Sequence, residues 1–159
     1  MKLGVITNCF KKNTKESIDL ASEMGFSGVQ IYATTGEFSP ASLSESDIEE
    51  YKALLAEKGL EVSALCADMG GHGFEIAEDN PERIEKTKAI IDLAVKLGSK
   101  VATTHIGVIP ADSTSEKYKT MLEALKECGE YAKAHGVTMA IETGQIGRAS
   151  CRERVSPRV

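Results

Sequence analysis

Short apolar runs alternate with amphipathic helical patterns along most of this sequence. The apolar runs begin near Leu3, Gly28, Glu61, Lys100 and Val137, at spacings of 25, 33, 39 and 37 residues. Strands that alternate with helices form parallel sheets through right-handed crossovers, because each helix carries the chain back to the end where the next strand starts. The order therefore predicts an α/β fold with five parallel strands and four helices.

The predicted helices have recognisable boundaries. A glycine follows each helical pattern, at the position where a left-handed residue ends many helices. These glycines are Gly25, Gly59, Gly98 and Gly136. At the starts, Asn80 precedes Pro81, and Ser113 with Glu116 forms a capping-box pattern. We expect Asn80 and Ser113 to cap their helices with their side chains.

Two parallel-sheet architectures fit this pattern. The run 137–141 has little polar alternation, which predicts strands covered on both faces, as in an open doubly wound sheet or a (β/α)8 barrel. A nucleotide-binding open sheet would carry G-x-G-x-x-G after the first strand, where this chain has Thr7-Asn8-Cys9-Phe10. A complete barrel needs about 250 residues, so a barrel reading implies that only its first part is present.

Composition narrows the function classes. The net charge is -5 with 42% hydrophobic residues, which is enough for a core and disfavours nucleic acid or anionic membrane as a partner. No apolar run approaches the roughly 18 residues of a membrane span, and we see no secretory signal. The four cysteines are scattered without a Cys-x-x-Cys pair, which favours reduced thiols. We therefore expect a cytoplasmic protein.

Residues 146–159 differ in composition from the rest. They hold four arginines and one glutamate, whereas residues 1–145 hold 15 basic and 23 acidic side chains. A basic end is usually a solvated terminal arm. However, the run IGRASCRERV matches the in-frame translation of a common short-read sequencing adapter, and Gln145 fits the preceding codon. We expect 145–159 to be a non-native, disordered tail, and the natural sequence to stop at Gly144 inside a longer gene.

Candidate functional residues lie where the predicted strands end. In both architectures, ligands bind at the carboxyl ends of parallel strands. Asp68 and His72 follow the third predicted strand, His105 ends the fourth and Glu142 ends the fifth. The remaining histidine, His135, precedes a helix-ending glycine, where a cationic ring would favour the helix dipole, so we assign it a structural role.

Each candidate also has a structural alternative. Glu142 ends an apolar run, so its carboxylate must be solvated, paired or bound to metal. His105 is either a hydrogen-bonded residue at the barrel rim or a ligand of substrate or metal. Asp68 and His72 either hold their loop together or contact substrate.

Five segments carry a family resemblance: GVITNCF, GFSGVQIYA, GLEVSALCADMGGHGF, NPERIEKTKAIIDLAVKLGSKVATTHIGVIP and GVTMAIETG. They resemble the sugar phosphate isomerase/epimerase family, the xylose isomerase-like barrels that also include abasic-site nucleases of the endonuclease IV type. The resemblance covers residues 1–144, and its most specific parts are the strand ends Thr-His-Ile-Gly and Ile-Glu-Thr-Gly.

The resemblance implies that residues 1–144 are the N-terminal portion of a (β/α)8 TIM barrel. In such barrels a glutamate at the fifth strand binds a divalent metal and often acts as acid and base, which maps onto Glu142. A histidine at the fourth strand end contacts substrate, or metal in the nuclease branch, which maps onto His105. The other metal ligands come from strands six to eight, which we do not find in this sequence.

The implied activity is a metal-dependent sugar or sugar phosphate isomerase or epimerase. The expected cofactor is a divalent Mn, Mg, Co or Zn ion, and the expected partner is a small-molecule sugar, with a homo-oligomer left open. Glu142 is the expected catalytic residue and metal ligand, and His105, His72 and Asp68 are the expected substrate contacts. Two alternatives stay open: an endonuclease IV-like phosphodiesterase, which the acidic charge disfavours, and a non-catalytic fragment, since a truncated barrel is expected to be inactive.

Overall fold

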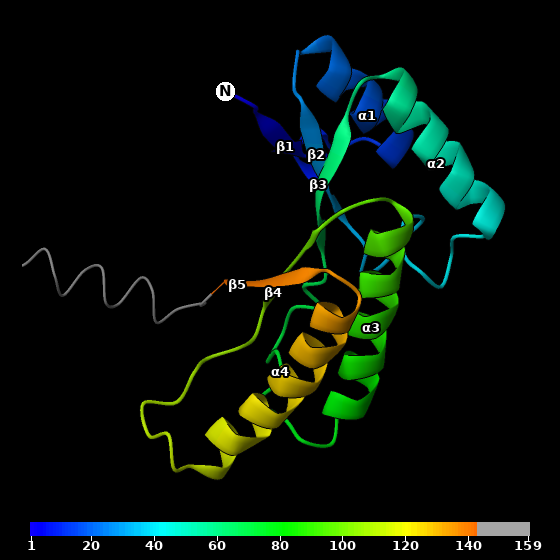
Figure 1. Cartoon of the computed structure of the whole chain (residues 1–159). Helices are drawn as coiled ribbons and strands as arrows, with labels where there is room; N and C mark the ends of the chain where they lie inside the picture. The colour runs from blue at the N-terminus through cyan, green and yellow to red at the C-terminus, as the bar shows by residue number, and fades with distance from the viewer. Residues whose placement is uncertain (143–159) are drawn as a thin grey trace, which may run out of the picture.

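A computed structural model describes residues 1–142 of the chain (Figure 1). The predicted tail at 145–159 lies outside the described residues. In chain order the elements are β1 (Gly4–Ile6), the 3-10 helix η1 (Thr7–Phe10), α1 (Thr14–Glu23), β2 (Gly28–Tyr32), α2 (Glu45–Glu57), β3 (Glu61–Cys66), α3 (Asn80–Lys96), β4 (Val101–His105), α4 (Glu116–Ala134) and β5 (Thr138–Glu142). The predicted alternation of five strands and four α-helices is confirmed.

The five strands form one parallel sheet in the order β1-β2-β3-β4-β5. Each strand pairs with the next one along the chain, as in the wall of a (β/α)8 barrel. The β4–β5 ladder runs without a register shift from Val101 opposite Thr138 to His105 opposite Glu142. All five carboxyl ends therefore lie at one rim of the sheet.

The two faces of the sheet differ in burial. Val29, Ile31 and Ala102 are buried in one core with residues of α1, α2 and α3. Among the residues pointing the other way, Ile6 and Tyr32 are exposed, whereas Ala64 and Cys66 are buried. The expectation that both faces are covered is wrong for the described residues, because their α-helices pack on one face only. The open face corresponds to the interior of a closed barrel.

The predicted helix ends are confirmed and the predicted caps are wrong. All four glycines have a positive φ, as the left-handed end of a helix requires. At the start of α3 the N-cap is Asp79, and the side-chain Nδ2 of Asn80 donates to the carbonyl of Phe74 instead of capping the helix. At the start of α4 the cap is Ser115, whose hydroxyl accepts from the Tyr118 amide, so Ser113 forms no capping box.

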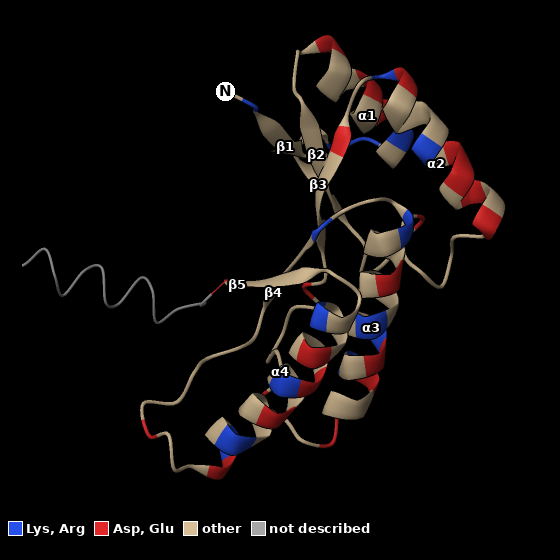
Figure 2. Cartoon of the chain, viewed as in Figure 1, with Lys and Arg blue, Asp and Glu red and all other residues tan. Residues whose placement is uncertain are grey.

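Charged residues are concentrated on the helices, and the strands are largely uncharged (Figure 2). Within the strands the acidic residues are Glu61 at the start of β3 and Glu142 at the end of β5. Glu61 pairs with Lys2 at the opposite end of the sheet from the predicted site. Among the described residues, no helix is both long and apolar enough to cross a membrane.

Candidate functional site

Three of the four predicted site residues form a chain of polar contacts at the rim of the sheet. Nδ1 of His105 lies 2.8 Å from Oδ2 of Asp68, and Nε2 of His105 lies 3.3 Å from Oε2 of Glu142. The three side chains come from β4, from the residues just after β3 and from β5, which are neighbouring strands. Because parallel strands end at the same rim, the strand order itself brings these residues together.

The two carboxylates beside His105 have different surroundings. The Asp68 side chain is 20% exposed, and its Oδ1 accepts a hydrogen bond from the Gly70 amide at 2.8 Å. The Glu142 side chain is 75% exposed, so its carboxylate keeps most of its contact with water. The His105 side chain is 41% exposed, a value between those of the two carboxylates. The chain thus runs from an enclosed carboxylate, through an imidazole, to a carboxylate open to solvent.

His72 belongs to a separate cluster. Its Nε2 lies 2.9 Å from Oδ2 of Asp79 and 3.5 Å from Nη2 of Arg83. Arg83 donates from Nη1 to the carbonyl of Gly70. Nδ1 of His72 is buried and has no hydrogen-bond partner among residues 1–142. These contacts join the loop after β3 to the first turns of α3. The structure therefore brings Asp68, His105 and Glu142 together and places His72 apart from them.

The loops that carry the two histidines are in direct contact. The Phe74 amide donates to the carbonyl of Ile106 at 3.0 Å. A side chain on Gly73 would place its Cβ 2.1 Å from the carbonyl carbon of Ile106, and one on Gly107 would lie 2.4 Å from the carbonyl oxygen of His72. Both glycines also have a positive φ, of 61° and 93°. Only glycine allows this approach, so the two loops hold each other in place.

Glu75 strengthens the same contact. Its Oε1 accepts from the Val108 amide at 2.6 Å, and its other oxygen pairs with Lys117 at the start of α4. Burial alone would raise the pKa of Glu75, but the Lys117 ammonium and the Val108 amide outweigh it and lower that pKa. Glu75 is therefore a charged clamp between the loop after β3 and the loop after β4.

Sequence reasoning missed several residues that help to shape this region. Asp79, Arg83 and Glu75 carry loop contacts, although their positions suggest only a loop and the first turn of a helix. On the open face, Nε2 of Gln30 donates to Oγ1 of Thr103 at 3.0 Å. The one available signal for Gln30 and Thr103 is that each lies within two residues of a strand end.

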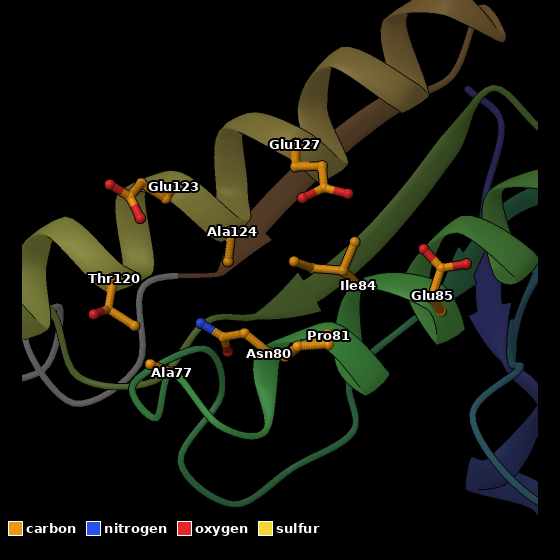
Figure 3. A pocket seen from close by; sticks show the side chains of 9 residues that line it. All are labelled: Ala77, Asn80, Pro81, Ile84, Glu85, Thr120, Glu123, Ala124 and Glu127. Carbon is orange, nitrogen blue, oxygen red and sulfur yellow. The ribbon is translucent and has the colours of Figure 1, made fainter.

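A cavity of about 380 Å³ lies elsewhere, between α3 and α4 (Figure 3). None of the four predicted site residues lines it. Two of its glutamates, Glu85 and Glu127, already share Lys88 at 2.9 and 2.7 Å, and these bonds raise the pKa of the lysine. We interpret this cavity as a groove between packed helices.

The site offers part of a metal-binding set. Imidazole nitrogen and carboxylate oxygen are both common ligands of zinc and related ions. His105 Nε2 and Glu142 Oε2 are 3.3 Å apart, a separation close to that of two ligands on one ion whose bonds are about 2.0–2.2 Å long. Residues 1–142 contain no cluster of three or more His, Cys, Asp or Glu side chains that could hold a metal. The donors present fit such an ion in kind and spacing but do not complete its coordination.

Comparison with known families gives a clear result. The family model of the xylose isomerase-like TIM barrel matches residues 18–150, which is most of the chain. The chain therefore belongs to the xylose isomerase-like TIM barrel family. A comparison with curated protein sequences gives no match.

Solved structures agree on the fold. The chain is similar to a xylose isomerase domain protein from Planctomyces limnophilus, with a TM-score of 0.75, 20% identity and coverage of 98% of this chain and 59% of that one. It is also similar to 3-keto-D-glucoside 4-epimerase from E. coli in its apo form, with a TM-score of 0.66 and 21% identity. That match covers 89% of this chain and 55% of the epimerase. A third similar structure is the IolI protein, solved with a bound zinc atom, with a TM-score of 0.68 and 18% identity. That match covers 89% of this chain and 51% of the IolI chain.

These likenesses confirm the predicted fold class. Five parallel strands and four helices match the N-terminal part of a (β/α)8 barrel. The chain spans between half and three fifths of the length of the three solved structures. At identities of 18–21% they show the fold alone, so the roles of Glu142, His105, His72 and Asp68 stay predictions.

Proposed function

We propose that this chain is part of a metal-dependent sugar or sugar phosphate isomerase or epimerase. The observation that carries the proposal is the Asp68–His105–Glu142 chain at the rim of three neighbouring strands. Membership of the xylose isomerase-like family supports it, as does the structural likeness to a sugar epimerase and to a zinc-containing protein.

In this proposal Glu142 and His105 act on the substrate at the open face of the sheet. The solvent-exposed carboxylate of Glu142 removes the proton from the carbon next to a sugar carbonyl. The enediolate that results regains a proton either on the opposite face, which epimerises the sugar, or on the neighbouring carbon, which interconverts aldose and ketose. A second acid or base must return the proton, and His105 contacts the substrate oxygens beside it.

A divalent ion bound at this rim would polarise the carbonyl and stabilise the negative charge that develops on the substrate oxygens. Glu142 would hold it, with His105 Nε2 as the neighbouring donor. Catalytic metal sites usually have at least three protein ligands. We therefore propose that residues 1–142 alone are inactive and bind divalent metal weakly, and that further ligands come from the rest of a full-length barrel.

Hydrogen exchange at the reacting carbon tests the proposed chemistry. The full-length protein, loaded with Mn²⁺, is incubated in D₂O with a panel of ketoses, ketose phosphates and an abasic DNA duplex. We expect deuterium to appear next to the carbonyl of at least one sugar, and Glu142→Gln to slow this exchange by at least about 10²–10⁴-fold. The matched control is Glu61→Gln, which removes a carboxylate at the other end of the sheet.

Three results would contradict the proposal. The first is a folded Glu142→Gln variant that exchanges protons at the normal rate. The second is exchange that survives complete removal of the metal by a chelator. The third is cleavage of the DNA duplex with no reaction on any sugar, which would favour the nuclease branch of the fold.

A further inference from the structure

Both carboxylate oxygens of Asp68 already contact groups of the protein. Its Oδ1 accepts from the Gly70 amide and its Oδ2 faces His105 Nδ1, both at 2.8 Å. The side chain is four-fifths enclosed. A carboxylate held in this way can determine the orientation of the group that it holds.

The contact between Asp68 and His105 determines where the imidazole carries its proton. An ionised carboxylate only accepts hydrogen bonds, so a 2.8 Å contact requires a hydrogen on Nδ1 of His105. In a neutral imidazole the other nitrogen, Nε2, is then an acceptor. Nε2 faces Oε2 of Glu142 at 3.3 Å, and that oxygen is also an acceptor when ionised.

We propose that Asp68 is a positioning residue that holds neutral His105 in the tautomer with hydrogen on Nδ1. Two acceptors, His105 Nε2 and Glu142 Oε2, then face each other at the open rim. Such a pair attracts an electropositive group, either a cation or a substrate hydroxyl hydrogen, and repels anions. The tautomer follows from the geometry alone, whereas the identity of the group bound by the acceptor pair rests on the proposed function.

The chain contains its own references for this proposal. His135 Nδ1 lies 2.8 Å from the carbonyl of Tyr131, which can only accept, so its hydrogen is on Nδ1. His72 Nε2 lies nearer to Oδ2 of Asp79, at 2.9 Å, than to Nη2 of Arg83, at 3.5 Å, so in the neutral ring the hydrogen is on Nε2 and points to Asp79. The three histidines of the chain therefore include one reference for each tautomer.

Nitrogen-15 NMR of the histidine rings reads the tautomers directly. The full chain is labelled with ¹⁵N and kept with a chelator at about pH 9, well above the ordinary pKa of imidazole. His105→Gln identifies the signals of His105 by their loss. We expect the His105 ring to match the Nδ1–H pattern of His135 and to differ from the pattern of His72.

Asp68→Asn should reverse the tautomer with little change in shape. The asparagine oxygen can still accept from Gly70, which leaves its NH₂ group to donate to His105 Nδ1 and moves the ring hydrogen to Nε2. Asp68→Ala removes both acceptors and should give a mixture of the two tautomers. The matched control is Asp112→Asn. In the parent chain the Asp112 carboxylate accepts only from Thr114, in the loop before α4, so this variant should leave His105 unchanged.

The outcomes separate this proposal from the proposed function. An Nε2–H ring or a mixture in the parent chain overturns the positioning role, and so does an Nδ1–H ring that persists in Asp68→Asn. The spectrum of the parent chain can overturn the proposal by itself, so the test does not depend on whether the variants fold. In a second step, Zn²⁺ is added without chelator to the full-length protein, because residues 1–142 alone are expected to bind metal weakly. If Zn²⁺ shifts the His105 Nε2 signal, and the shift disappears in Glu142→Gln, a metal is supported. If Zn²⁺ causes no shift, the result counts against the metal and leaves the tautomer result unchanged.

Discussion

Two histidines, one at the end of β4 and one in the loop after β3, have opposite surroundings in this chain. His105 ends β4 with one ring nitrogen on the enclosed Asp68 and the other facing the exposed Glu142. His72, in the loop after β3, has one ring nitrogen on Asp79 and the other buried without a hydrogen-bond partner among the described residues. The first ring has one nitrogen on a carboxylate and the other facing the exposed rim, whereas the second has one nitrogen on a carboxylate and the other closed off from solvent.

The difference shows why residue type and position do not by themselves define a site. Both histidines follow strands at the same rim, and both contact a carboxylate. What separates them is which nitrogen faces solvent and whether a second acidic group lies beside it. On this criterion His105 belongs to the proposed reacting centre, and His72 helps to hold the loop that supports it.

Replacing each histidine in turn gives the largest expected contrast. In the full-length protein we expect His105→Gln to lower kcat/KM by about 10²–10⁴-fold, because a group in contact with the reacting atoms is lost. His72→Gln should lower it by less than about tenfold, since that ring acts through its loop. Steady-state kinetics on the sugar found by hydrogen exchange measures both.

Urea unfolding of the same two variants serves as the control. We expect His72→Gln to lower the unfolding midpoint more than His105→Gln does, which is the reverse of their order in activity. Equal losses of kcat/KM at matched stability would remove the distinction between the two histidines.

The glycine contact that joins the two loops gives the next largest effect. Gly73→Ala puts a Cβ within 2.1 Å of the Ile106 carbonyl carbon, so the backbone must move. Gly25→Ala has the same left-handed strain, with no atom within 4 Å of its Cβ. We expect about 1–2 kcal/mol of destabilisation for Gly25→Ala and at least about 2 kcal/mol more for Gly73→Ala. Similar urea midpoints for the two variants would show that the loops do not depend on each other.

Much of this arrangement could be predicted from the sequence. The periodic patterns predicted the order of strands and helices, and the family resemblance implied the barrel topology. The rule that ligands bind at strand ends selected four residues, of which the structure brings together Asp68, His105 and Glu142 but not His72. The rule works because parallel pairing forces successive strand ends to the same rim. It depends on the sheet and needs no knowledge of the loops.

The partners inside the loops could not be predicted in this way. His72 reaches Asp79 and Arg83 because Gly70, Gly71 and Gly73 all have a positive φ, and no periodicity encodes that path. The caps failed for a related reason, since each depends on a single hydrogen bond. A turn at Asp112, whose carboxylate accepts from the Thr114 amide, precedes α4, and Ser115 rather than Ser113 becomes the cap.

The clamp at Glu75 gives the smallest expected effect and tests whether the two loops are joined by charge as well as by shape. Its pKa is lower in the folded chain than in the unfolded one. The stability it contributes is therefore complete above the unfolded value of about 4.3, and it is lost as the pH falls through the folded pKa. Glu75→Gln should lower the urea midpoint at pH 7, by less than Gly73→Ala does, and the gap to the parent chain should close as the pH falls below about 4.

Lys117→Met should show the same behaviour, and adding it to Glu75→Gln should cost little more, because both changes break one pair. Fully additive losses, or a gap that is independent of pH, would mean that Glu75 holds the loops through its contact with Val108 alone.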